Sequence, residues 1–83
     1  MKVTVKLFGA LREYLPTGSS FSSCELNLIE NATIADLLGK LPLPENKAFL
    51  IIHNDEKVNS DAFATTEIED RDEIVLLPPI KGG

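Results

Sequence analysis

The sequence has little of what most catalytic and metal-binding sites require. It holds one Cys and one His in 83 residues. A single Cys cannot form an internal disulfide. A structural zinc site takes about four ligands, and the chain offers only Cys24 and His53 as thiolate or imidazole donors. We therefore expect no disulfide, no metal site and residence in the reducing cytoplasm.

Long apolar runs and an excess of basic residues are also absent. No stretch approaches the roughly 20 apolar residues of a membrane span, and the start lacks the charged-then-apolar pattern of a secretory signal. The net charge is -5, and residues 51–83 hold eight acids against three bases, whereas residues 1–50 hold five of each. We expect no membrane anchor and no nucleic-acid partner, because nucleic-acid binding needs a basic footprint. The acidic excess fits a solvated face, or steering toward a basic protein surface.

What is present is enough apolar sequence for one small core, at 43% hydrophobic residues. Alternation of apolar and polar residues over 2–8 predicts a half-buried strand, followed by a short helical turn that Pro16 ends. Alternation returns over residues 24–28, which predicts a second strand antiparallel to the first. Residues 1–77 are expected to form the folded domain and residues 78–83 an extended tail.

A helix is predicted to follow. Thr33 is its N-cap, with Asp36 in the position of a capping-box acid. One apolar stripe at helical spacing runs along it, and Pro42 and Pro44 stop it. Its members are Ile34, Leu37, Leu38 and Leu41.

The second half of the chain predicts three further strands. The continuous apolar run 49–52 is consistent with a strand buried on both faces. A tight turn at 53–56 leads to a brief strand around Val58. Residues 59–69 are expected to be irregular, with Phe63 and Ile68 as core anchors. Residues 73–77 form the last strand. This order predicts an α+β fold, a mixed sheet with one main helix across one face. If the first and last strands are parallel central neighbours, the fold is a β-grasp.

The residues that could carry side-chain chemistry have simpler interpretations. Cys24 shares an alternating face with Leu26 and Leu28, so it is interpreted as a small buried hydrophobe. His53 is interpreted as a surface or hydrogen-bonded histidine, because no second imidazole could share a metal or a relay. Asp70 and Asp72 flank a turn, where Asp often caps its own backbone. None of the four is predicted to be catalytic.

The tail is the unusual segment. Pro78 and Pro79 lack backbone N–H groups and have restricted φ, so the chain should leave the sheet stiff and extended. Gly82 and Gly83 have no side chains, which would let the backbone enter a narrow channel. The alternative is an ordinary flexible terminus. We favour a rigid stalk that carries a bare carboxylate, which ATP-dependent adenylation could activate.

An apolar patch is expected beside the root of the tail. If the helix covers one side of the sheet, Val75 and Leu77 are partly exposed on the other, and Phe8 emerges nearby from the first strand. Such a patch beside a working terminus suggests a partner-docking site. The competing view, that both faces of the last strand are buried, stays open.

The start "VKLFGALREY", the helix "TIADLLGKL" and above all the end "DEIVLLPPIKGG" resemble the small sulfur-carrier subunits of molybdopterin synthase, in the ubiquitin-like MoaD/ThiS family. The resemblance covers essentially the whole chain. It implies a ubiquitin-like β-grasp fold and a subunit that is not a catalyst by itself. An E1-like adenylating enzyme would use ATP to activate Gly83, which becomes a thiocarboxylate and supplies sulfur for the dithiolene of molybdopterin. No bound cofactor is implied.

The resemblance also implies roles for the tail and its partners. Pro78, Pro79, Ile80, Lys81 and Gly82 would belong to the segment inserted into the large synthase subunit, with which the family suggests a heterotetramer. Two departures lie in turns: Asn54-Asp55 stands where relatives commonly have Asn-Gly, and Arg71-Asp72 where they have Gly-Asp.

Three other functions stay open. The chain could be a ubiquitin-like modifier joined to lysines through Gly83, or a sulfur carrier of the thiamine pathway, whose members tend to be shorter and often lack the paired prolines. It could also be a passive binding module whose tail is incidental.

Overall fold

The computed structural model describes residues 1–15, 20–44 and 48–79. Within these residues, the strands and helices follow the predicted order: the helical turn expected after the first strand is a 3-10 helix, and one further short 3-10 helix precedes the last strand. The elements are β1 (Lys2–Leu7), η1 (Gly9–Tyr14), β2 (Ser23–Asn27), α1 (Ile34–Leu38), β3 (Leu50–His53), β4 (Glu56–Val58), η2 (Ser60–Ala62) and β5 (Glu73–Leu77).

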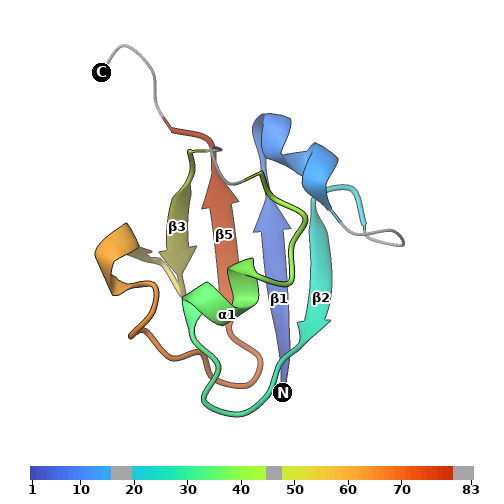
Figure 1. Ribbon diagram of the computed structural model, residues 1–83. Coiled ribbons are helices and arrows are strands. Elements are labelled where there is room, and N and C mark those ends of the chain that lie inside the picture. The colour runs from blue at the N-terminus through green and yellow to red at the C-terminus, as the bar shows by residue number, and fades with distance from the viewer. Residues whose placement is uncertain (16–19, 45–47, 80–83) are drawn as a thin grey trace.

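The strands form one mixed sheet in the order β2-β1-β5-β3-β4. β1 and β5, the first and last strands, are parallel neighbours at its centre, and the other pairs are antiparallel. α1 lies across one face of the sheet (Figure 1). This arrangement is a β-grasp, and it confirms both the predicted fold class and the predicted place of the first and last strands.

The hydrophobic core lies between the sheet and α1. Its strand residues alternate with outward-facing ones, so one face of each central strand is buried. Burying one such side chain stabilises the fold by roughly 1.5–3 kcal/mol before conformational entropy is subtracted. The largest fully buried side chains are Leu7, Leu11, Ile34, Leu37, Ile51, Ile74, Leu76, Val3 and Val5.

The predicted capping box begins α1. The Thr33 hydroxyl accepts a hydrogen bond from the Asp36 amide at 3.3 Å, and the Asp36 carboxylate accepts one from the Thr33 amide at 2.9 Å. The regular helix ends at Leu38, sooner than the predicted stop at Pro42. Its last turn tightens, because the amide of Leu41 bonds to the carbonyl of Leu38, three residues back. The Leu41 side chain is still buried.

The prediction that the 49–52 run is buried on both faces is wrong. Ile51 is fully buried, but Leu50 and Ile52 on the other face are only half-buried. The single helix covers only one face of the sheet, so the other face of this strand stays partly exposed. A continuous apolar run in the sequence does not reveal this difference between the two faces. This difference enlarges the apolar surface beside the tail.

Cys24 also differs from its interpretation as a buried residue. It faces the core across from Val5, but it is only partly buried, because β2 is an edge strand.

In residues 59–69, which were expected to be irregular, η2 forms a single short turn. Ile68 is buried and Phe63 packs against the core, as predicted.

Two turns are hydrogen-bonded to each other at the end of the sheet where β5 begins. The Asp72 carboxylate accepts hydrogen bonds from His53 Nε2 at 2.7 Å, Asn54 Nδ2 at 2.9 Å and the Glu69 amide at 2.8 Å. The Asn54 side chain also accepts from the amide of Glu73 at 2.9 Å. His53 is therefore a hydrogen-bonded histidine and Asp72 a turn residue, as interpreted. The carboxylate of Asp70, in contrast, accepts from the amide of Lys2 at 2.8 Å.

The same turns hold residues in left-handed backbone conformations. Asn54 has φ 48°, Asp55 has φ 72° and Arg71 has φ 69°. A Cβ makes this region unfavourable, by about 1–2 kcal/mol for an ordinary residue and less for Asn or Asp. Arg71 is therefore the strained member.

We predict that Arg71→Gly stabilises the protein. Relief of the left-handed strain exceeds the added chain entropy of Gly, for a net gain of roughly 0.5–1 kcal/mol. The Arg71 side chain is 91% exposed and its ion pair with Asp70 is long, at 3.9 Å, so little else is lost. Urea unfolding at constant m measures the gain. Arg71→Ala, which keeps the Cβ, is the control, and equal stability of the two variants would contradict the explanation.

We predict that Asp72→Asn changes how the free energy of unfolding depends on pH in the acid range. Burial raises the pKa of the Asp72 carboxyl, but the hydrogen bonds from His53, Asn54 and the Glu69 amide outweigh it, so the pKa lies below its ordinary value. The charged form therefore stabilises the fold above the unfolded pKa, and this contribution is lost as pH falls through the folded pKa. The variant should lose about 1–2 kcal/mol at neutral pH, a deficit that shrinks below about pH 4.

Urea unfolding over a pH series measures this deficit. Asp70→Asn is the matched control, since Asp70 lies in the same turn with a more exposed side chain. A deficit of Asp72→Asn that stays constant through the acid range would contradict the assignment.

Candidate functional site

The root of the tail lies at the centre of one end of the sheet. Leu77 is the last paired residue of β5, opposite Leu50 of β3, and on the other side the Phe8 amide bonds to the Leu76 carbonyl at 3.2 Å. Pro78 and Pro79 are exposed and have no N–H with which to continue the pairing. The chain therefore leaves the sheet here, at the end opposite the N-terminus (Figure 1).

The rest of the predicted tail lies outside the described residues. These are Ile80, Lys81, Gly82 and Gly83.

An apolar patch on the face away from α1 borders this root. β-sheet register places Leu50 opposite Leu77 and Ile52 opposite Val75, so the four side chains share that face. All four are half-buried, and Phe8, which follows β1, is 37% exposed. We call these five residues the open-face patch. Partial exposure of Phe8, Val75 and Leu77 was predicted from the sequence, whereas that of Leu50 and Ile52 was not.

Charged residues border the open-face patch. Lys6 lies beside Val75 in the sheet and pairs with Glu73 at 3.1 Å, and Lys57 lies beside Ile52. The Lys6–Glu73 pair is exposed on both sides, so it contributes little stability. An apolar centre with a charged rim is the usual anatomy of a protein-binding surface.

Cys24 and His53 are not brought together. Both lie in the same row across the sheet, through the pairs Cys24–Val5, Val5–Ile74 and Ile74–His53. Three strand spacings separate them, roughly 14 Å. Within residues 1–15, 20–44 and 48–79, no group of three or more His, Cys, Asp or Glu could hold a metal ion. No helix in that part of the chain is long and apolar enough to cross a bilayer.

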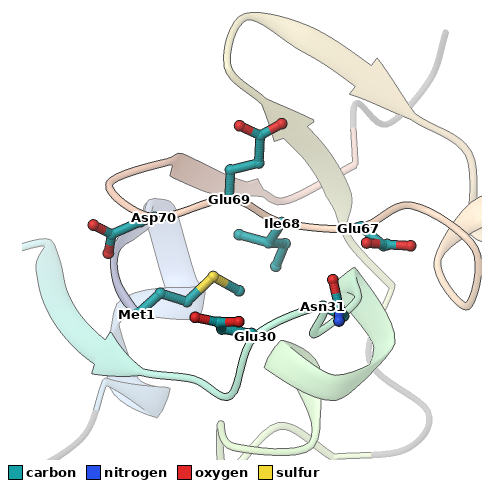
Figure 2. Close-up of a pocket in the computed structure, with 7 residues that line it drawn as sticks. All are labelled: Met1, Glu30, Asn31, Glu67, Ile68, Glu69 and Asp70. Carbon is teal, nitrogen blue, oxygen red and sulfur yellow. The ribbon is translucent and has the colours of Figure 1, made fainter.

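The acidic excess of the sequence gathers in part at the opposite end of the molecule. A pocket there is lined by Met1, Asn31 and Ile68 and by four acidic residues, and Figure 2 shows the four carboxylates spread around it rather than meeting at one point. This pocket makes a negative surface far from the tail. The four acids are Glu30, Glu67, Glu69 and Asp70.

Comparison with known proteins gives the family. The sequence profile of the ThiS family matches residues 5–83. Among curated proteins, none matches this sequence. Among solved structures, subunits 1 and 2 of molybdopterin-converting factor from Helicobacter pylori form a complex in which one chain is 26% identical to this protein, with all of both chains covered and a TM-score of 0.67.

Two archaeal structures are similar as well. The small archaeal modifier protein 1 (SAMP1) from Methanosarcina acetivorans is 25% identical over 99% of this chain and 96% of its own, with a TM-score of 0.68. SAMP1 from Haloferax volcanii is 23% identical over the whole of both chains, with a TM-score of 0.70, and shows the shared fold. The match over nearly the whole sequence shows that the chain belongs to the ThiS family of ubiquitin-like sulfur carriers.

Proposed function

We propose that this protein is the sulfur-carrying subunit of a molybdopterin synthase. One observation carries the proposal: a stiff Pro78-Pro79 segment leaves the centre of the sheet beside an apolar patch and leads to Gly82-Gly83. The similarity to a chain of the H. pylori molybdopterin-converting factor complex supports it. The protein is then not a catalyst by itself, because one partner charges its working atom and another uses it.

The chemistry explains why the tail needs two partners. A carboxylate resists nucleophilic attack, because its negative charge and resonance lower the electrophilicity of the carbon. Attack of the Gly83 carboxylate on the α-phosphorus of ATP, in an E1-like adenylating enzyme, releases pyrophosphate and forms an acyl adenylate. A sulfide-level sulfur nucleophile then displaces AMP and leaves a thiocarboxylate. Gly at this position leaves the carbonyl carbon unshielded.

The open-face patch supplies the docking surface in this proposal. Its five apolar side chains lie at the root of the tail, so a partner seated on them would hold the last residues close to its own active site. Both the adenylating enzyme and the large synthase subunit would use it in turn, the latter in a heterotetramer. Partner recognition and the reacting terminus would thus lie next to each other on the same end of the protein.

A modifier function is the second candidate, and the similarity to the M. acetivorans SAMP1 favours it. Activation of Gly83 would be the same, but a lysine amine would displace AMP and form an isopeptide bond. Because Lys81 precedes Gly82-Gly83, trypsin would leave a Gly-Gly remnant on the modified lysine. Such remnants in cell extracts, lost when Gly83 is deleted, would favour the modifier. A thiamine-pathway carrier and a passive module have less support, the first because of the paired prolines.

We predict that Gly83 is loaded with sulfur. Incubation with an E1-like adenylating enzyme, ATP and a sulfide source should raise the intact mass by the difference between sulfur and oxygen. Deletion of Gly83 should abolish the gain and leave the unfolding free energy unchanged, because the described core lies within residues 3–76. No gain, with an enzyme that is active on another carrier, would contradict the proposal, as would loading of the truncated chain.

We predict that Ile52→Thr weakens partner binding at the open-face patch. The substitution keeps a β-branched side chain, so the strand is preserved while the apolar surface shrinks. The loss of affinity for the adenylating enzyme should be about five- to thirtyfold, since a partly buried interface side chain contributes roughly 1–2 kcal/mol. Titration calorimetry measures it.

Ile29→Thr is the matched control for this experiment. Ile29 is more exposed than the patch residues, at 77%, and follows β2 at the end of the sheet away from the tail. It should bind as the wild type does. Equal losses in the two variants would mean that the open-face patch is not the docking surface.

A further inference from the structure

Gly9 lies against the root of the tail in a conformation that a side chain would disturb. It follows β1 directly and has φ +59°, in the left-handed region. A Cβ at this position would be 3.0 Å from Cγ of Pro78 and 3.6 Å from its Cδ. The first distance is shorter than an ordinary van der Waals contact, so Pro78 would have to move.

Both sides of this contact are fixed by the sheet. On the side of Gly9, the Phe8 amide bonds to the Leu76 carbonyl at 3.2 Å, and the Phe8 carbonyl accepts from the Leu11 amide at 3.1 Å as η1 begins. On the other side, Pro78 follows Leu77, which is paired with β3. The contact therefore joins two ends of strands that the central parallel pair already holds together.

The neighbour of Gly9 is a ring that can yield only by a change of pucker before the main chain must move. A long flexible side chain would rotate away from an added methyl group, but the atoms of a proline ring are bonded to its backbone nitrogen and fix its φ. A larger movement of the Pro78 ring therefore turns the main chain at Pro78 and Pro79, where it leaves the sheet.

We propose that Gly9 is a positioning residue that sets the direction in which the tail leaves the sheet. Without a side chain, it lets the Pro78 ring pack on the end of β1. The inference rests on the proposed function, because direction matters only if the terminus must reach a partner's active site. Gly9 itself takes no part in the chemistry.

The test compares Gly9→Asn, Gly9→Ala and the double variant Gly9→Asn/Pro78→Ala. Asn tolerates the left-handed conformation, so Gly9→Asn adds the Cβ with less backbone strain and keeps the test valid if Gly9→Ala fails to fold. Sulfur loading by the adenylating enzyme should fall by roughly tenfold or more in kcat, with KM little changed, because docking on the open-face patch is intact.

The double variant separates positioning from a general loss of stability. Removing the Pro78 ring makes room for the new Cβ, so kcat should recover from the value of Gly9→Asn to that of Pro78→Ala alone, which is the control for the loss of one ring from the stiff segment. Wild-type kcat in folded Gly9→Asn, or a double variant whose kcat stays below that of Pro78→Ala, would overturn the proposal.

A second measurement does not depend on sulfur loading. In the wild type, nuclear Overhauser effects should connect the Gly9 α protons to the Pro78 ring protons, and Gly9→Asn should lose them while the resonances of Ile52 and Val75 stay in place. Absence of these effects in the wild type would overturn the positioning role. If these effects are seen but the wild-type protein is never loaded with sulfur, the proposed function is wrong although Gly9 and Pro78 are in contact.

Discussion

The parallel pairing of β1 and β5 is the constraint on which the arrangement of the molecule depends. It joins the two ends of the chain at the centre of the sheet, with Val5 opposite Ile74 and Leu7 opposite Leu76. All four side chains are fully buried against the core, and slipping β5 by one residue along β1 would turn Ile74 and Leu76 to the open face. The pairing places the exit of the tail beside the end of β1 instead of at a sheet edge.

The second constraint is that the sheet has two faces and α1 can cover only one of them. α1 covers the face that holds Ile51 and Leu76, and the outward-facing side chains of β3 and β5 stay half-exposed. That incomplete cover has a cost in stability, since these side chains gain only part of their possible burial energy. It leaves an apolar surface at the root of the tail, where the proposed carrier function would use it for docking.

Structural features that depend on residues close together in the sequence could be predicted. The capping box of Thr33 and Asp36 and the tight turn at 53–56 depend on residues a few positions apart, and both were predicted. The extent of the open-face patch was underestimated, because an apolar run such as residues 49–52 does not reveal which face a helix will cover.

Long-range contacts were beyond the reach of periodicity. The packing of Pro78 on Gly9 and the hydrogen bond between Asp70 and the Lys2 amide join opposite ends of the chain. Only the β1–β5 register brings those residues together. The resemblance to sulfur carriers supplied the family, which the comparison confirmed, and the role of Gly83 remains a proposal.

The most direct test of the carrier function follows the sulfur after loading. Purified thiocarboxylated protein would be mixed in a single turnover with the large synthase subunit and its pterin substrate, and the intact mass followed with time. If the protein is a sulfur carrier, the mass should return to that of the carboxylate as the sulfur appears in the pterin product, with the chain otherwise unchanged. Sulfur that stays on the chain, or a chain that becomes attached to lysines instead, would contradict it.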